Sequence, residues 1–386
     1  METVMNYDYV IIGTGIQALI LLDRMRALGL NVCCIEPDSH AGEGQTHRLP
    51  FYVHRGHFYA ERELTGQLRD TYPSWQNMIR RLGVRIRSTE SYVGFVDDSS
   101  RWTKTWDALD IPYTRTSAKT GLLSGHRLKE VFSFPHMLFD GRELVAKLRQ
   151  ANRDLLRRGT IRHISRCWQG YRLFAGDQLI TANKLIVCAG ANTSSVLSGI
   201  PDVDAGVTTQ TRVCQVLTMR GAVANGSIVV PDAQMSIAPQ YTADGSTVLL
   251  YTHGTSPIRT EKNHRIDLAR LEQQLDSLRA TLPGLSDAGR VRGIYTTLET
   301  ESAALGKRSR GSRSFVDEVA EDVLCVLPGK PSFAMNASDQ LLSRLNLGRR
   351  REAQSPPAEM TPQYFSPRIQ QAFERVQHAP QAVSQL

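Results

Sequence analysis

The sequence predicts an α/β fold in which a Rossmann-like dinucleotide-binding domain carries an inserted domain with an antiparallel sheet. Three observations support this prediction. A strand, a glycine-rich turn, a helix, a second strand and an acidic residue follow one another within the first 36 residues. Alternating strand patterns occur later, at 211–217 and 247–251. The chain has 386 residues, which is too long for one small core and fits two domains or one domain with a large insertion.

The order of elements near the N-terminus is the strongest signal. Residues 9–12 form an apolar, β-branched run that is typical of a buried parallel strand. Residues 13–18 read G-x-G-x-x-A, and a segment of helical composition, 19–30, follows directly. A second apolar run, 31–35, ends at Glu36. Since strand, turn, helix and acid occur in this order, we expect the segment to bind a dinucleotide.

Residues of this turn have individual mechanical roles. Gly13 permits the tight turn, Gly15 lets the backbone approach a pyrophosphate, and Ala18 lets the helix lie close to the strand. The free N–H groups at the start of the helix suit a phosphate. Glu36 can accept hydrogen bonds from ribose hydroxyls and would repel a 2′-phosphate, which argues against NADP. A glycine turn that serves packing alone is the alternative interpretation.

The composition is that of a folded, basic protein. Hydrophobic residues make up 41% of the chain and charged residues 22%, which excludes a disordered chain. Lysine and arginine number 46 against 38 acidic residues, so the net charge is +8. This balance excludes a strongly acidic surface and is compatible with an anionic partner, although a basic enzyme from an arginine-rich genome explains it more simply.

The cysteines, the N-terminal residues and the apolar stretches of the sequence indicate the cellular compartment of the protein. The six cysteines form no C-x-x-C pair, and four of them lie in apolar runs, as expected for buried thiols in a reducing environment. The N-terminus carries Glu2 and Asp8 and lacks the basic segment of a secretory signal. The longest apolar stretch, 9–22, is too short and too interrupted to span a bilayer. We therefore expect a cytoplasmic protein that has no disulfide frame and no membrane partner.

Later motifs favour FAD over NAD. After Glu36 comes a small, polar loop at 39–46 in place of the next strand–helix unit, and residues 184–191 form a buried strand that ends in A-G-A. Together with the first motif, 140–145 and 323–330, these segments resemble the FAD-dependent D-amino acid oxidase superfamily, which includes glycine oxidase and sarcosine oxidase. In such proteins the strand corresponding to 184–191 passes near the flavin, and the last glycine turn meets the isoalloxazine ring.

The resemblance implies FAD as cofactor and a division of the chain. It implies a discontinuous FAD-binding domain of glutathione-reductase type at 1–50, 135–200 and 290–345, a substrate domain at 51–134 and 201–289, and a C-terminal tail at 346–386. The expected FAD-binding residues are Gly13, Gly15, Ile16, Gln17, Ala18, Glu36, Gln45, Thr46, Ala189, Gly190, Gly329 and Lys330. Lys330 would lie near the flavin pyrimidine, where a cation stabilises negative charge on the reduced ring.

The resemblance also implies the reaction, which is amine oxidation. A hydride leaves the carbon next to nitrogen, the resulting imine hydrolyses, and molecular oxygen reoxidises the flavin to give hydrogen peroxide. The expected partner is a small amine or amino-acid substrate. Such a reaction does not require a side-chain base, so the sequence nominates no particular side chain as the catalytic acid or base.

The anchor for a substrate carboxylate is left open by the sequence. Amino-acid oxidases of this family hold the carboxylate with an arginine near a G-L-R-P-type stretch. The closest stretch here, 292–297, has Tyr295 in the arginine's place, which argues against a free α-amino acid or moves the anchor elsewhere. Candidate arginines and pocket tyrosines are Arg48, Arg259, Arg292, Tyr241, Tyr251 and Tyr295. Each is otherwise a surface arginine or a packing aromatic.

Residues 47–59, directly after the FAD loop, form an unusual segment. Three histidines and two arginines lie within eleven residues. We expect part of this segment to face the flavin or the substrate. The spacing of His47, His54 and His57 does not match a helix-borne metal site, so no metal is predicted.

Alternative functions follow from the basic clusters at 80–87, 157–162 and 307–313, which are either solvated faces or contacts to a phosphate backbone. The superfamily includes nucleic-acid-modifying branches, so the same chemistry could act on an amino-acid-decorated base in DNA or tRNA. An FAD monooxygenase would normally show a G-D-x-x-H-type segment, which the sequence lacks. A non-catalytic basic binding protein is disfavoured by the intact Gly13 and Glu36.

Overall fold

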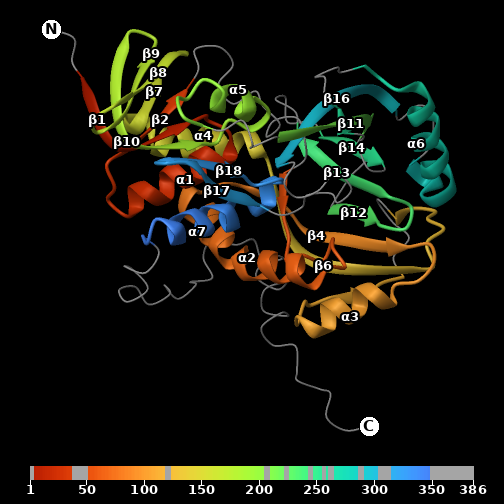
Figure 1. The fold of residues 1–386 in the computed structure, drawn as a ribbon. Helices are drawn as coiled ribbons and strands as arrows, with labels where there is room; N and C mark the ends of the chain where they lie inside the picture. Colours follow the sequence, from red (N-terminus) through yellow and green to blue (C-terminus); the bar gives the residue numbers. More distant parts are fainter. Residues whose placement is uncertain are drawn as a thin grey trace.

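The computed structural model contains two β-sheets with helices packed against them (Figure 1). The structure describes residues 4–36, 51–117, 123–203, 209–220, 226–241, 247–253, 258–259, 265–285, 291–302 and 314–347. The mixed α/β fold that the sequence predicts is confirmed. Apart from its first two residues, the predicted tail at 346–386 lies outside the described residues.

The first sheet has a parallel centre. Its strand order is β17-β18-β10-β1-β2-β7, and β8 and β9 extend from β10 as an antiparallel hairpin. The bounds are β1 Met5–Ile12, β2 Val32–Glu36, β7 Leu156–Arg158, β8 Ile161–Cys167, β9 Gly170–Ala175, β10 Gln178–Val187, β17 Phe315–Ala320 and β18 Val323–Leu327. Strands β2 and β18 are buried along their whole length, as their apolar, β-branched sequences predict.

Helices enclose this sheet from both sides. On one face, α1 (Ile16–Ala27) and α7 (Ala334–Arg344) share a core with the central strands, and on the other face α5 (Thr193–Leu197) packs against the β8–β9 hairpin. Helices α2 (Arg62–Leu82) and α4 (Gly141–Ala151) form a further core beside α1. No helix within the described ranges combines the length and the apolar character that a membrane span needs.

The second sheet is mostly antiparallel. Its order is β15-β11-β14-β13-β12-β4-β6-β3, with β16 paired to β11 and β5 paired to β6. The bounds are β3 Phe51–Val53, β4 Ile86–Phe95, β5 Thr114–Arg115, β6 Glu130–Phe139, β11 Thr209–Arg220, β12 Gly226–Val230, β13 Met235–Tyr241, β14 Thr247–His253, β15 Ile258–Arg259 and β16 Val291–Ser302. The predicted strands at 211–217 and 247–251 lie within β11 and β14.

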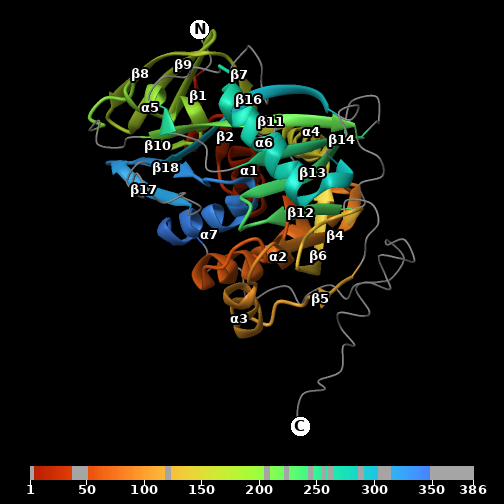
Figure 2. The same ribbon diagram turned by 90° about the vertical axis from the view of Figure 1, so that its right-hand side faces the viewer.

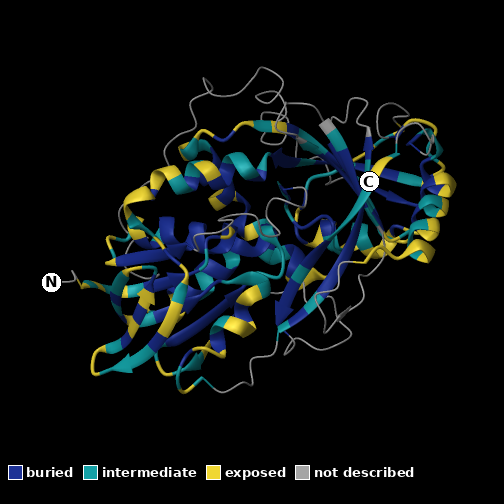
Figure 3. Ribbon diagram, turned by 90° about the horizontal axis from the view of Figure 1, so that it is seen from above, coloured by how far each residue is buried: buried dark blue, intermediate teal, exposed yellow. Residues whose placement is uncertain are grey.

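Two helices cover the second sheet. Helix α6 (Leu268–Thr281) packs on β11 to β14, and α3 (Ser100–Ala108) packs through Trp106 on the aromatic residues of β4 and β6 (Figure 2). The short 3₁₀ helices are η3 (Arg153–Leu155), η4 (Gly190–Asn192), η5 (Pro283–Leu285) and η8 (Pro331–Phe333). Buried residues run through the strands of both sheets, and exposed residues lie on the outer helix faces (Figure 3).

The proposed division into two domains follows the two sheets at most points. Strand β16 departs from this division, because its residues fall in the segment predicted for the FAD-binding domain but pair with β11 of the second sheet. Strand β6 likewise crosses the predicted boundary at residue 135 while pairing with β4. We therefore propose a division in which both strands belong to the substrate domain.

Candidate functional site

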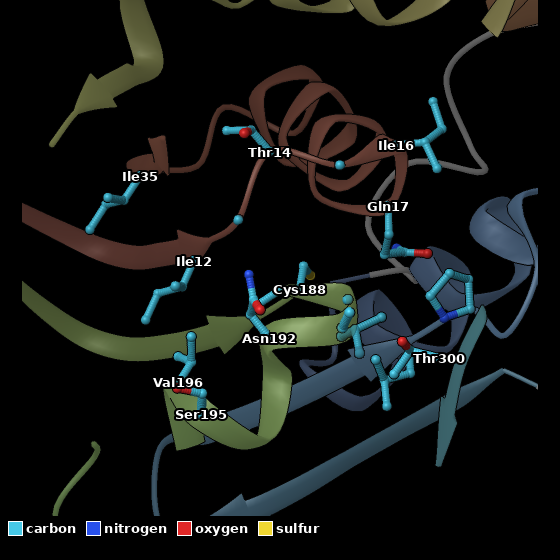
Figure 4. A pocket seen from close by; sticks show the side chains of 18 of the residues that line it. Ile12, Thr14, Ile16, Gln17, Ile35, Cys188, Asn192, Ser195, Val196 and Thr300 are labelled. Carbon is cyan, nitrogen blue, oxygen red and sulfur yellow. The ribbon is translucent and has the colours of Figure 1, made fainter. Parts of the chain in front are cut away.

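A cavity of about 500 Å³ lies at the carboxyl ends of the central strands of the first sheet (Figure 4). This is the edge at which parallel α/β sheets usually bind ligands. The residues expected to bind FAD that line it are Gly13, Gly15, Ile16, Gln17, Ala189, Gly190, Gly329 and Lys330. Of the other expected residues, Ala18 is buried on α1 and Glu36 is buried at the end of β2, whereas Gln45 and Thr46 lie outside the described residues.

The two glycines of the first motif differ in what surrounds them. Gly13 has a φ of +116°, and a Cβ built on it would lie 2.6 Å from the carbonyl oxygen of Cys188. Gly15 is the extended N-cap of α1, with a φ of −70°, and a Cβ there would meet nothing within 4 Å. The backbone conformation and the packing of the fold therefore require a glycine at position 13. At Gly15, the missing side chain instead leaves open space beside helix α1.

The first turn of α1 suits the phosphates of FAD. No side chain caps this helix end, and the buried Oε1 of Gln17 has no hydrogen-bond partner among the described residues. Orphan N–H groups and the positive end of the helix dipole favour an anion at this position. Together with the open space at Gly15, these features fit a bound dinucleotide.

Glu36 is not among the residues that line the cavity, and its carboxylate is already paired. Its carboxylate is 1% exposed and accepts hydrogen bonds from both terminal nitrogens of Arg149 on α4, with Arg149 Nη2 at 2.8 Å from Glu36 Oε2. Arg158 Nε lies 3.7 Å from the same carboxylate. A ribose hydroxyl would therefore share Glu36 with two guanidinium groups. Sequence reasoning missed Arg149, because nothing in the local pattern links it to a residue 113 positions away.

Residues associated with both sheets meet at one end of the cavity. Lys330 follows Gly329 after β18, and its ammonium donates to the hydroxyl of Tyr59 at 2.8 Å while lying 4.8 Å from the centre of that ring. Thr300 of β16 also lines the cavity, and its buried hydroxyl has no partner among the described residues. Figure 4 shows Thr300 and Gln17 toward one end of the cavity and Ile35 toward the other.

The described part of the histidine-rich segment packs under this end. The Thr65 hydroxyl of α2 donates to the carbonyls of Gly56 and Tyr59, which fixes the turn that carries Tyr59. Of residues 51–59, none is among those that line the cavity. The segment therefore reaches the cavity through the contact between Tyr59 and Lys330. That part of this segment faces the flavin or the substrate stays a prediction.

Three buried imidazoles lie beside this turn. His54 and His57 have ring centres 5.3 Å apart, His57 stacks on Phe134 at 4.3 Å, and His136 lies across the sheet with its Nδ1 3.5 Å from the Ser227 hydroxyl. Burial holds the pKa of all three well below the usual histidine value, and Lys330 lowers that of His54 further. These histidines are therefore neutral at pH 7. No group of three side chains able to hold a metal occurs among the described residues.

The neutral histidines predict acid sensitivity of the fold. Burial lowers the pKa of His136 to about 3, so between pH 6.5 and 3 the unfolded chain binds a proton that the folded chain does not. Stability is thus lost as the pH falls below 6.5, and His136 alone accounts for about 2 kcal/mol between pH 7 and pH 5. Urea unfolding at the two pH values should show a smaller loss in His136→Gln. The control His163→Gln, at an exposed histidine, should match the wild type; equal losses in all three proteins would contradict the prediction.

The substrate candidates that the structure describes are not among the residues that line the cavity. Tyr251 is fully buried in the core under α6, and its hydroxyl donates to the Gln274 carbonyl at 2.9 Å. Tyr295 is half-buried opposite Val216, and Arg292 is exposed on β16. Arg48 lies outside the described residues, as do the side chains of Tyr241 and Arg259. Tyr251 thus has a packing role, and the carboxylate anchor remains a prediction.

A buried ion pair that the sequence did not reveal lies next to Thr300. Arg212 of β11 donates to Glu301 of β16 at 2.5 Å, and their side chains are 7% and 8% exposed. The Gln210 side chain donates to the same carboxylate at 2.8 Å. Because Thr300 and Glu301 are neighbours on β16, this pair fixes the strand that forms one wall of the cavity.

Comparison with known proteins identifies the family. The family model described as "FAD dependent oxidoreductase", DAO, matches residues 8–320. A search of curated proteins finds no match. Among solved structures, L-proline dehydrogenase from P. horikoshii is 12% identical with a TM-score of 0.72, and the match covers 90% of this chain and 96% of that one.

Two further structures share this fold. Glycine oxidase from Geobacillus kaustophilus is 13% identical with a TM-score of 0.66, covering 92% of this chain and 97% of its own. L-α-glycerophosphate oxidase from Mycoplasma pneumoniae, with FAD bound, is 14% identical with a TM-score of 0.71, covering 88% and 95%. The chain belongs to the DAO family of FAD-dependent oxidoreductases, and FAD is its cofactor.

Proposed function

We propose that the protein oxidises the C–N bond of a glycine-type or amino-acid-type amine to an imine, which then hydrolyses, with hydrogen peroxide as the second product. The composition of the cavity lining carries this proposal. Of the described residues that line the cavity, only Cys188 and Lys330 have ionisable side chains, and burial raises the pKa of the Cys188 thiol far above neutral pH. A hydride leaving a neutral amine needs no acid or base, so this lining suits that reaction.

The protein's own residues would bind, orient and exclude water. The N-terminus of α1 and Gly15 would hold the phosphates of FAD, which when bound supplies the hydride acceptor. Lys330, held by Tyr59, would place a fixed positive charge at the end of the cavity near the second sheet. The apolar side chains of Ile12, Val326 and Leu327 would keep that charge and the reacting bond out of water.

The names of similar structures support the substrate class. Glycine oxidase and L-proline dehydrogenase are named for amino-acid substrates that carry a C–N bond. A hydride leaves the carbon next to nitrogen when the amine is neutral, because the nitrogen lone pair then assists its loss. We therefore expect turnover to rise with pH until the substrate amine is deprotonated.

Anaerobic mixing of the purified, yellow protein with candidate amines tests the proposal. Glycine, sarcosine and D-amino acids form one set, and glycine attached to a nucleobase forms the second. Loss of flavin absorbance, followed by peroxide release when oxygen is admitted, is the expected result for at least one amine. NADPH serves as the control, because its oxidation without any response to amines would indicate a monooxygenase and overturn the proposal.

A further inference from the structure

The β8–β9 hairpin carries two exposed aromatic side chains on the surface of the first sheet. Trp168 lies in the two-residue turn between β8 and β9 and is 89% exposed, and Phe174 of β9 is 37% exposed. Gly170 follows this turn with a φ of +115°, and a Cβ at this position would clash with the carbonyls of Ala182 and Asn183. This turn therefore holds the indole ring of Trp168 in solvent, and the ring does not pack into a core.

Only one face of the hairpin packs against the protein. Tyr171, Leu173 and Ala175 are fully buried in the core that includes α5. Side chains alternate along a strand, so Arg172 and Phe174 point to the opposite, open face, about 7 Å apart. Across the ladder, Phe174 pairs with His163 and Arg172 pairs with Ser165. We define the outer hairpin face as His163, Ser165, Arg172 and Phe174, with Trp168 at the turn and the exposed Arg162 at the irregularity between Ile161 and His163.

Positive charge is concentrated in this part of the chain. Residues 156–184 contain six basic residues and one acidic residue, Asp177, a net charge of +5 out of +8 for the whole protein. Arg166 pairs with Glu321, and Lys184 pairs with Asp322. In the described part of the chain, neither Arg162 nor the exposed Arg172 has an acidic partner. The outer hairpin face therefore joins unneutralised arginines to exposed aromatic rings.

We propose that the outer hairpin face binds a single-stranded nucleic acid. Arg162 and Arg172 contact phosphates, and unpaired bases stack on Trp168 and Phe174. A sheet face or groove that combines positive charge with aromatic rings is the usual platform for single strands, since every base has a face that stacks. Charge complementarity selects this partner over an apolar protein surface, because the aromatic rings alternate with arginines and do not form one continuous patch.

The position of the hairpin connects this surface to the cavity. Gly159, Thr160 and Ile161 line the cavity, and Ile161 is the first residue of β8. The β8–β9 hairpin that carries the outer hairpin face therefore begins at residues that line the cavity. The proposal does not depend on which amine is oxidised, and it holds equally for a small free amine and for an amine carried on a base.

Fluorescence anisotropy of the FAD-loaded, full-length protein tests the proposal. The probes are a labelled 20-nucleotide single-stranded DNA, the RNA of the same sequence, and the DNA duplex. The proposal expects a single strand to bind more tightly than the duplex, with affinity that falls as salt rises. Trp168→Ala is expected to weaken binding at least about fivefold, the lower limit for one stacked base. Arg162→Glu with Arg172→Glu is expected to lower the slope of log affinity against log salt by about 1.4.

A matched control separates this surface from general charge. Arg101 and Lys104 are exposed on α3, which Figures 1 and 2 both place far from β8 and β9. Changing both to glutamate alters the net charge as much as the hairpin double variant does, and it should leave binding unchanged. Flavin absorbance and amine turnover should stay at wild-type levels in every variant, which keeps the test independent of the proposed oxidation.

Several results would overturn the proposal. They are absence of binding to both single strands, equal loss of binding in the hairpin and α3 double variants, and binding to vesicles of anionic lipid without binding to either oligonucleotide. A preference between the DNA and RNA probes identifies the source of the strand, and either preference supports the proposal.

Discussion

Replacement of Gly15 by valine is expected to abolish retention of FAD while the protein still folds. The φ of −70° at Gly15 is open to any L-residue, and a Cβ meets no protein atom within 4 Å, so the chain itself tolerates a side chain. That open space lies at the start of α1, where the pyrophosphate of FAD would bind. Two methyl groups there should weaken FAD binding by about 3 kcal/mol, or roughly 100-fold.

Gly13→Ala is the informative partner of this variant. Its φ of +116° and the 2.6 Å approach to the Cys188 carbonyl mean that a methyl group strains the protein even without FAD. Backbone strain of this type costs about 1–3 kcal/mol. The ratio of absorbance at 450 and 280 nm reports bound flavin, and thermal unfolding of the apoprotein reports the fold. Equal destabilisation of the two apoproteins would contradict this distinction.

Replacement of Glu301 by glutamine is expected to lower the free energy of unfolding by about 3–5 kcal/mol, because it removes the buried carboxylate that pairs with the Arg212 guanidinium. Gln210 would also lose a charged acceptor. The double variant Arg212→Met with Glu301→Leu removes both charges and should recover much of this loss, because replacing a whole buried pair by apolar residues is often neutral.

Urea unfolding at a fixed excess of FAD measures these changes. Asp276→Asn is the matched control, since it breaks the Arg279–Asp276 pair on α6, whose side chains are 60% and 73% exposed. That change should cost less than about 1 kcal/mol. A Glu301→Gln variant as stable as the control, or a double variant less stable than the single one, would contradict the buried-pair account.

The features beside the cavity that the sequence indicates are those that depend on local sequence. The turn from Gly13 to Ala18 needs small residues at fixed spacing. The composition of the segments on either side predicts the strand before the turn and the helix after it. The order β1, α1, β2 and the cavity at their ends follow directly from that pattern.

The parts that the sequence could not predict depend on pairing between distant segments. Arg149 meets Glu36 only because α4 packs beside α1, and Tyr59 meets Lys330 across 271 positions. Tyr251 was a pocket candidate by residue type, yet the alternation of β14 directs it into the core under α6. The face on which a strand residue lies depends on register, and register is decided by the whole sheet.

The position of β18 in the first sheet has a consequence for synthesis of the protein. This strand, Val323–Leu327, pairs with β10, and the cavity-lining residues up to Pro331 follow it. A nascent chain therefore exposes Gly13 and Gly15 to the cell long before the wall opposite them exists. Contacts of such sequence separation form late and slowly. The complete cavity would therefore be able to hold FAD only after β18 had left the ribosome, so cofactor loading would depend on translation of nearly the whole described chain.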